Sequence, residues 1–256
     1  MDEVRTVLAD NPGILTGAGT NTYVVEVEPG LVAVIDPGPD MAGHLEAIVR
    51  AVGDRTPVAI LLTHGHPDHC ALAPSLARRL SLPVIGHRLL TQVGVDRALV
   101  DGEAAFGLTA IHTPGHSPDH LAFVKSGSAF CGDLVLSEIT PVIPPYPQGD
   151  MDDYLTSLHR LRRLSSVLLY PGHGPLIRSP SVAIDTVIEH RLARESKVLS
   201  ALAHGPQDLD ALLLNVYADT EPARHSLARL TLLAHLHRLE LQQRVVAIGR
   251  EWTLTA

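Results

Sequence analysis

Three histidines and one aspartate lie within six consecutive residues of this 256-residue chain. They are His64, His66, Asp68 and His69, in the pattern H-x-H-x-D-H, directly after the apolar segment Pro57–Leu62. Imidazole nitrogens and carboxylate oxygens are ligands that Zn²⁺ and related divalent metals accept in proteins. A solvated polar turn would not require four such side chains at this spacing. The pattern therefore indicates a metal site at the end of a buried strand.

Three further turns carry side chains of the same kinds. His116 lies in a Pro-Gly turn, Asp133 ends the segment Ala129–Asp133, and His173 follows the segment Val167–Tyr170 between two glycines. Because each turn follows or links predicted strands, we expect these residues to join the first four at one edge of a sheet. Seven ligands exceed the roughly four that one Zn²⁺ takes. The count favours two ions that share a carboxylate.

A pair of metal ions would make this site hydrolytic. Two ions roughly 3.5–4 Å apart can hold a bridging water, lower its pKa and polarise an oxygen of the substrate. We therefore predict a hydrolase in which a bridging hydroxide attacks the substrate and in which Asp68 and Asp133 act in catalysis. Zn²⁺ is the expected ion, with Fe and Mn as alternatives. The chain has no G-x-S-x-G motif for a serine nucleophile, and we expect no organic cofactor.

Other polar residues close to these turns have more than one interpretation. Asp36, at the end of an apolar segment, either caps its own turn or orients a ligand histidine. We expect His120 to support a ligand and His112 to be an ordinary strand residue. Cys70 and Cys131 are expected to be small buried residues, although a thiol beside the site is also a candidate zinc ligand.

Strands and helices alternate in the part of the chain that carries these turns. The hydrophobic periodicity predicts strands within 17–27, 31–35, 57–62, 83–86, 107–112, 121–124, 129–133 and 167–170. It predicts helices at 41–52, 71–80, 152–164, 182–203, 209–216 and 223–241, followed by a hairpin at 245–248 and 252–254. The proline-rich segment Ile139–Gln148 is either the wall of a pocket or a plain surface connection.

Composition narrows the class of protein. Hydrophobic residues make up 45% of the chain and charged residues 19%, as in an ordinary globular protein. No apolar run approaches the roughly twenty residues that cross a bilayer, and Met1–Arg5 lacks the features of a secretion signal, so we expect a cytoplasmic protein without a membrane partner. The net charge of −8 argues against a general nucleic-acid coat.

The ordered motifs THGHPDH, TPGH, CGD and PGHG resemble those of the metallo-β-lactamase-fold hydrolases. Within that superfamily, GTNTYVV, IDPG, YPGHGPLI and the helix containing His190–Glu195 are similar to the β-lactamase-like protein 2 branch. The resemblance implies an α+β fold, with a four-layer αββα sandwich over residues 1–180 and a C-terminal helical, winged-helix-like domain over residues 181–256.

The resemblance also implies a division of the ligands. One ion would be held by His64, His66 and His116 and the other by Asp68, His69 and His173, with Asp133 bridging both. Two departures from related sequences stand out. The segment Cys70–Ala73 replaces a usual Gly-Gly pair, and the Ile139–Gln148 loop differs from the shorter connection of the ribonuclease members.

Three functions are consistent with these features. The first is hydrolysis of a small ester, thioester or lactone. The second is an endoribonuclease or other phosphodiesterase, with RNA as its substrate, since metal pairs also serve phosphoryl chemistry. The third is a DNA-binding regulator that uses the winged helix. Residues 181–256 carry 8 basic and 9 acidic residues, so we expect no duplex DNA binding and predict that this segment packs on the catalytic domain or forms a homodimer contact.

Overall fold

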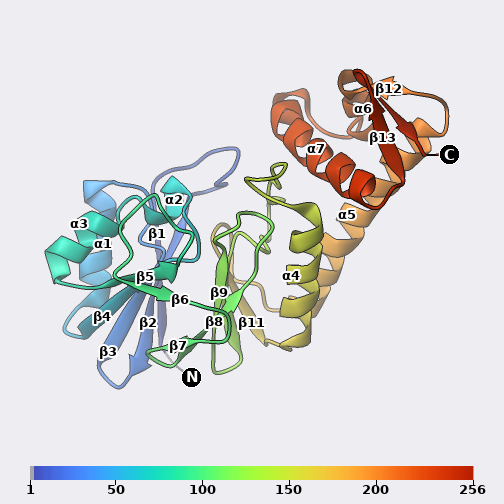
Figure 1. Ribbon diagram of the computed structural model, residues 1–256. Helices are drawn as coiled ribbons and strands as arrows, with labels where there is room; N and C mark the ends of the chain where they lie inside the picture. Colours follow the sequence, from blue (N-terminus) through green and yellow to red (C-terminus); the bar gives the residue numbers. More distant parts are fainter. Residues whose placement is uncertain (1–2, 256) are drawn as a thin grey trace.

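Two β-sheets lie face to face in the larger lobe of the molecule (Figure 1). The computed structural model describes residues 3–255, so Met1 and Asp2 of the predicted signal-free amino terminus lie outside it. The first sheet has the order β1 (Val4–Leu8), β2 (Asn21–Glu28), β3 (Leu31–Ile35), β4 (Thr56–Leu61), β5 (Val84–His87) and β6 (Arg97–Leu99). The second has the order β11 (Leu168–Pro171), β10 (Ser128–Gly132), β9 (Leu121–Lys125), β8 (Leu108–His112) and β7 (Ala104–Ala105).

Alternation along the strands divides the apolar side chains between two faces. Tyr23 and Val25 of β2 pack between the sheets against Phe123 and Phe130 of the second sheet. Val24, between them in sequence, points to the opposite face. Each sheet therefore has two buried faces, which is why several strands read as continuous apolar runs.

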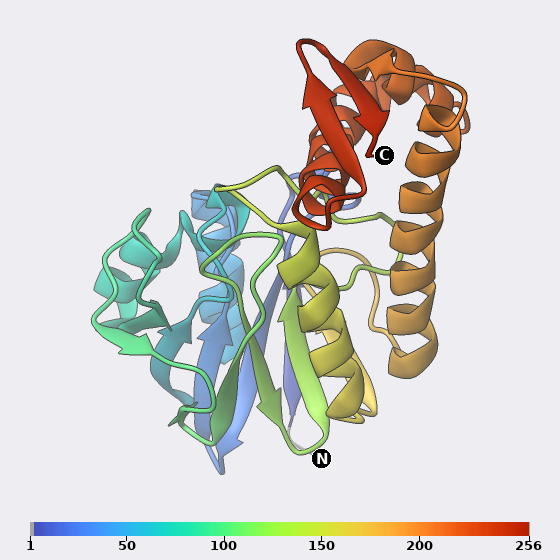
Figure 2. The same ribbon diagram turned by 45° about the vertical axis from the view of Figure 1, so that its right-hand side comes forward.

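Helices cover the two outer faces and complete four layers (Figure 2). α1 (Ala42–Val52) and α3 (Ala73–Leu80) bury Ile48 and Leu76 against the first sheet. α4 (Met151–Arg163) and α5 (Pro180–Leu202) bury Tyr154 and Ile184 against the second. The expected α+β class with a four-layer sandwich is confirmed.

The C-terminal segment adds a small helical unit with its own core. It contains α6 (Leu209–Val216), the short 3₁₀ helix η1 (Pro222–Arg224), α7 (His225–Leu241) and a sheet in the order β12 (Gln207–Asp208), β14 (Glu251–Leu254), β13 (Val245–Ile248). The predicted helix–helix–hairpin pattern is confirmed. The division between residues 180 and 181 stays a prediction; α5 begins one residue before it, at Pro180.

α5 takes part in two hydrophobic cores. Ile184 and Ile188, in its first half, pack with α4, whereas Val198 and Leu202, near its end, pack with α6 and α7. The C-terminal unit also contacts the sandwich directly, because Arg238 Nε of α7 donates to Asp152 Oδ1 at 2.8 Å. The expected packing of this unit on the catalytic part is confirmed.

The structure differs from the predicted elements in a few places. The helix predicted at 71–80 is α3, which begins at Ala73, and a separate short helix that was not predicted, α2 (Pro67–Cys70), precedes it. Pro74 lies in the first turn of α3 and has no N–H with which to continue a ladder from α2. The four strands β1, β6, β7 and β12 were not predicted. β6, β7 and β12 span only two or three residues, too few for an alternating pattern. Within residues 3–255, no helix combines the length and the apolar character that crossing a membrane requires.

Candidate metal centre

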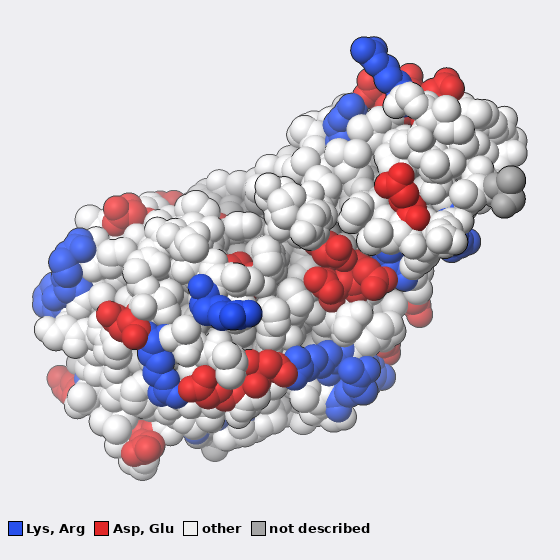
Figure 3. Space-filling model, viewed as in Figure 1, with Lys and Arg blue, Asp and Glu red and all other residues white. Residues whose placement is uncertain are grey.

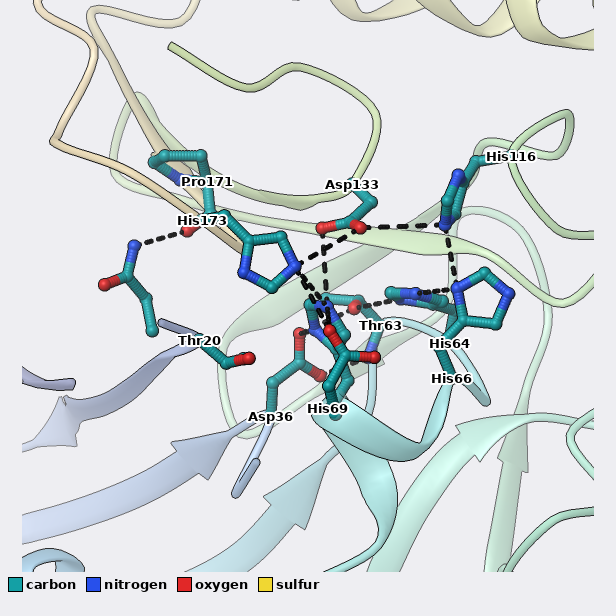
Figure 4. A network of polar contacts seen from close by, with 12 residues as sticks. Thr20, Asp36, Thr63, His64, His66, His69, His116, Asp133, Pro171 and His173 are labelled. Carbon is teal, nitrogen blue, oxygen red and sulfur yellow. Dashed lines mark hydrogen bonds and ion pairs between the residues drawn. The ribbon is translucent and has the colours of Figure 1, made fainter. Parts of the chain in front are cut away.

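The seven predicted site residues gather at one edge of the two sheets, beyond the ends of their strands (Figure 4). His64 and His66 follow β4, and Asp68 and His69 lie in α2, immediately after them. The other three members come from the turn between β8 and β9, from the end of β10 and from the end of β11: His116, Asp133 and His173. The convergence expected from the sequence is therefore present.

Three histidines form the first group of facing donor atoms, His64, His66 and His116. His66 Nδ1 lies 3.0 Å from His64 Nε2 and 2.9 Å from His116 Nε2. His64 is fully buried and His116 is nearly so, whereas His66 is only partly covered. The group is therefore open to solvent mainly on the side of His66.

The second group contains one carboxylate and two histidines, Asp68, His69 and His173. His173 Nε2 lies 3.3 Å from both Asp68 Oδ2 and His69 Nε2. Asp68 does not cap its helix with a side-chain hydrogen bond, although its place in the first turn of α2 would allow it. Its carboxylate instead faces the two histidines, and 29% of its side chain is exposed.

Asp133 lies between the two groups. Its Oδ2 is 3.6 Å from His116 Nε2 of the first group and 3.5 Å from His173 Nε2 of the second. Its Oδ1 is 3.4 Å from His69 Nε2, is buried and accepts no hydrogen bond from residues 3–255. An unsatisfied buried carboxylate oxygen is costly, so an ion beside it would remove a penalty.

Outer hydrogen bonds fix which nitrogen of His116 and of His173 faces the centre. His116 Nδ1 lies 2.9 Å from the Val142 carbonyl, and His173 Nδ1 lies 3.1 Å from the Gly19 carbonyl. A carbonyl only accepts, so each Nδ1 carries a proton, and in the neutral ring it is Nε2 that presents a lone pair to the centre. These are the tautomers that a metal ion requires. The donor set therefore fits divalent ions.

Asp36 supports histidines of both groups. Its Oδ2 lies 3.0 Å from His69 Nδ1 and accepts from the Thr63 hydroxyl at 2.6 Å. Because that hydroxyl is already donating, Thr63 Oγ1 is free to accept from His64 Nδ1 at 3.0 Å. Of the two interpretations of Asp36, orientation of a ligand histidine is the one that the contacts support.

The electrostatics of the centre are dominated by burial and by Asp133. Burial lowers the pKa of His64 well below its usual value and that of His116 to about 4. Burial alone would also lower the pKa of His69, but the carboxylates of Asp133 and Asp36 raise it well above its usual value. The neighbouring imidazolium charges in turn hold the pKa of Asp133 well below its ordinary range, against its burial. The side chain of Asp133 is therefore an ionised carboxylate.

Gly172 lets the backbone of the last turn approach the centre. A Cβ at this position would lie 2.4 Å from Asp133 Oδ1 and 2.6 Å from His69 Cε1. A larger residue than glycine would therefore clash at position 172, next to His173. The same turn is held from the first sheet, because Asn21 Nδ2 donates to the Pro171 carbonyl at 3.0 Å.

The remaining polar residues take supporting places. His120 is fully buried; its Nδ1 contacts Thr113 Oγ1, and its Nε2 accepts from the Asp133 backbone N–H at 3.2 Å. His112 ends β8 and stacks on His87 with ring centroids 4.5 Å apart. Both observations agree with the expectations for these two histidines.

Neither cysteine faces the centre. Cys70 Sγ donates to the Gly65 carbonyl and packs in the outer core of the first sheet, and Cys131 Sγ donates to the Val135 carbonyl. Burial raises the pKa of Cys70 to about 11 and that of Cys131 to about 12, so both remain thiols. Their expected role as small buried residues is confirmed.

Two supporting residues were not anticipated from the sequence, Thr63 and Asn21. Thr63 immediately precedes His64, and that position could have marked it as a supporting residue. The role of its hydroxyl becomes clear only when the fold places Asp36 beside it. Asn21 stands in the segment GTNTYVV, 150 residues before the turn that it holds.

Comparison with known families gives two matches. Residues 15–107 and 91–173 match the family described as the Metallo-beta-lactamase superfamily. Residues 209–252 match the Beta-lactamase associated winged helix domain. The two matches cover the sandwich and the C-terminal unit respectively.

Two relatives illustrate the range of similar sequences. A Beta-lactamase-like protein 2 homolog of Caenorhabditis elegans is 30% identical over 237 residues, which cover 86% of this chain and 78% of the relative. An atrochrysone carboxyl ACP thioesterase of Aspergillus fumigatus is 33% identical over 210 residues, which cover 78% of this chain and 64% of the relative. This chain therefore corresponds to a little under two thirds of the fungal thioesterase.

Two solved structures are similar in fold. A metallo-beta-lactamase family protein from Thermus thermophilus superposes with a TM-score of 0.82 over 98% of both chains, at 23% identity. A second protein, solved in a di-iron-bound form, is 32% identical and superposes with a TM-score of 0.59 over 70% of this chain and 96% of its own. The first match includes the C-terminal unit as well as the sandwich.

Proposed function

Since the chain belongs to the metallo-beta-lactamase superfamily, as its motifs predicted, we propose that it is a dinuclear metal-dependent hydrolase of small esters, thioesters or lactones. The observation that carries this proposal is the position of Asp133, whose two oxygens reach both groups of facing donors. That arrangement suits two ions rather than one.

Each ion would have three ligands of its own. His64, His66 and His116 would hold one, and Asp68, His69 and His173 the other, with Asp133 shared. Two such ions would supply an acidified water and a Lewis acid for the scissile carbonyl. Zn²⁺ is the expected metal, although the di-iron form of one similar protein keeps iron a real alternative.

The protein's own residues prepare the centre. Val142, Gly19 and the Asp36 carboxylate hold the imidazoles in the tautomers that present lone pairs inward. Asp68 and His66 are the two members of the centre that are partly exposed. A substrate would therefore enter on their side and meet Asp68, consistent with the catalytic role predicted for that carboxylate.

Among acyl substrates, thioesters are favoured by the comparison. The Aspergillus fumigatus relative carries the name of an acyl carrier protein thioesterase. No particular substrate follows from this, because the match covers 64% of that protein. The name of this relative is nevertheless a reason to test thioesters first in a substrate panel.

The proposal is tested by loading the purified protein with zinc, measuring its metal content, and assaying it against simple thioesters, esters and lactones. We expect about two equivalents of zinc and hydrolysis of at least one acyl class. Asp133→Asn should abolish the activity and lower the zinc content, because it removes the shared carboxylate charge. A fully loaded protein that cleaves none of the three classes would refute the proposal.

A further inference from the structure

A cavity of about 380 Å³ lies where the C-terminal unit meets the sandwich. Its lining comes from the early loop at Ile14 and Leu15, from the segment Ile139–Val142, from α5 and from the region between Tyr217 and Thr231. None of the seven metal-centre residues borders it. The proline-rich loop is therefore a pocket wall, which decides between its two interpretations.

One cation in this cavity has no counter-ion. Arg191 of α5 is 3% exposed, and no carboxylate within residues 3–255 lies at ion-pair distance from it. Its Nη2 donates to the Pro141 carbonyl at 2.5 Å, while its Nε has no partner in the described chain. The Tyr154 ring lies 5.4 Å from Arg191 Cζ and offers a cation–π contact, but no carboxylate balances the charge. A buried guanidinium without a counter-ion is costly, and an anion in the cavity would offset that cost.

The neighbouring charges do not neutralise Arg191. Arg194, on the same helix, already donates to Asp219 at 2.6 Å, and Arg224 lies 3.9 Å from Glu221. Asp219 is shared by Arg194 and Lys197, and Glu221 lies beside Arg224, so neither carboxylate is left to balance Arg191. The Tyr217 hydroxyl, buried in the same wall, also lacks a hydrogen-bond partner among the described residues. The cavity therefore contains two hydrogen-bond donors without partners among the described residues, Arg191 Nε and the Tyr217 hydroxyl, together with the positive charge of Arg191.

The cavity and the metal centre share a wall. The Pro141 carbonyl accepts from Arg191, and the next carbonyl, that of Val142, accepts from His116. Two consecutive peptide groups thus contact the cation of the cavity and a histidine of the centre. Apolar side chains complete the lining, Leu15, Ile139 and Leu227 among them. The segment Ile139–Val142 thus lies between the cavity and the outer side of His116, and a ligand held by Arg191 would have to extend past this segment to reach the metal ligands.

We propose that this cavity binds the anionic group, a carboxylate or a phosphate, of an acyl substrate whose carbonyl lies at the metal centre. The inference rests on the proposed hydrolase function and adds the substrate class to it. Arg191 would be the main anchor, since charged hydrogen bonds to a guanidinium are the strongest that the cavity can offer.

The test uses matched substrates and the zinc-loaded protein. The thioester of N-acetylcysteamine with glutarate carries a free carboxylate, and its methyl ester does not. Acetyl-4′-phosphopantetheine and acetyl-pantetheine differ only in the phosphate of the leaving group. We expect kcat/KM to favour the charged member of one pair by about tenfold or more, which identifies whether the anion belongs to the acyl or the thiol part.

Arg191→Met should reduce that preference about tenfold. A merely structural Arg191, which held the loop behind His116, would lower the activity toward both members of a pair equally, and that result would overturn the proposal. Arg229→Gln is the matched control, because Arg229 is an exposed α7 arginine paired with Asp210 outside the cavity. It should leave the preference unchanged.

Tyr217→Phe is the second variant, in case Arg191→Met does not fold. It removes only a hydroxyl that has no partner among the described residues, so the fold should be retained. The preference for the charged substrate should fall a few-fold. An unchanged preference would count against the cavity as the binding site.

Calorimetric titration of glutarate and of inorganic phosphate separates this inference from the proposed function. Binding that is lost in Arg191→Met, in a protein that hydrolyses no acyl substrate, would support the cavity and refute the hydrolase. Hydrolysis without a charge preference, together with equal anion binding by both proteins, would support the hydrolase and refute the cavity.

Discussion

The carboxylate of Asp36 lies 3.0 Å from Nδ1 of His69, on the side of the ring that faces away from the metal centre. Asp36 has a positive φ of 48°, which Asn tolerates well. Asp36→Asn should therefore fold while losing the charge that orients His69. We expect metal affinity to fall about 10- to 100-fold, the range typical of such outer partners.

Metal content after dialysis against graded chelator measures this change. Asp54→Asn, at an exposed loop position outside the centre, serves as the control. If Asp36→Asn retained both metals as firmly as the original protein, the orienting role of Asp36 would be wrong.

Gly172→Ala tests the close approach of the last turn. Its Cβ would lie 2.4 Å from Asp133 Oδ1, so either the turn or the carboxylate has to move. We expect at least a roughly tenfold loss of activity or of the bound metal, because displacements of about 1 Å at a reacting centre can cost about 10²-fold. Gly43→Ala, which meets nothing within 4 Å in α1, should change neither property.

His235 should contribute a specific pH dependence to stability. It is fully buried on α7, with Arg191, Arg194, Arg238 and His190 nearby and Glu195 at 3.9 Å. Burial and the neighbouring cations lower its pKa from 6.5 to about 3. The unfolded chain therefore takes up the proton first, and the free energy of unfolding should fall as the pH drops from about 6.5 towards 3, by up to about 1.4 kcal/mol per pH unit.

Denaturant titrations of the original protein and of His235→Leu at several pH values in this window measure the effect. Their difference isolates the single proton from the other acidic transitions. Parallel curves for the two proteins would show that His235 is not the responsible group.

Binding to nucleic acid should be weak. The three arginines of the α7 region all have acidic partners: Arg224 lies near Glu221, Arg229 contacts Asp210, and Arg238 contacts Glu195 and Asp152. On the face shown in Figure 3, lysines and arginines form separate small groups with acidic side chains between them. We therefore predict no sub-micromolar binding of duplex DNA and no cleavage of single-stranded RNA by the metal-loaded protein.

Fluorescence anisotropy at low salt, with a labelled duplex and a labelled RNA, checks the binding, and gel analysis of the same RNA checks for cleavage. Tight binding that weakened steeply with salt would revive the regulator hypothesis, and cleaved RNA would revive the phosphodiesterase.

The convergence of the candidate ligands could be predicted because its signals are local. His64, His66, Asp68 and His69 are nearly contiguous and follow an apolar strand, so their types and their position in the fold were both readable. The other turns were recognisable because each places one ligand type after a strand. The assignment of individual ligands to individual ions stays a prediction.

What the sequence concealed depends on distant contacts. Thr63 matters only because Asp36, 27 residues earlier, accepts its hydroxyl hydrogen. The missing counter-ion of Arg191 becomes visible only when α5, Tyr217 and the proline-rich loop close around one cavity. β6 and β7 are too short to show periodicity, and β6 forms only where it can pair with β5.

The sharing of α5 between two cores bears on how the chain unfolds. One half of α5 packs in the sandwich and the other half in the C-terminal unit. Unfolding of either core would therefore remove contacts that hold α5 in place in the other core. The chain should consequently melt as one cooperative unit, without a stable half-folded species. A protease that nicks α5 at its middle would therefore release no intact hydrolase fragment, and shortening the chain at residue 180 would remove the α5 residues, Ile184 and Ile188, that pack with α4.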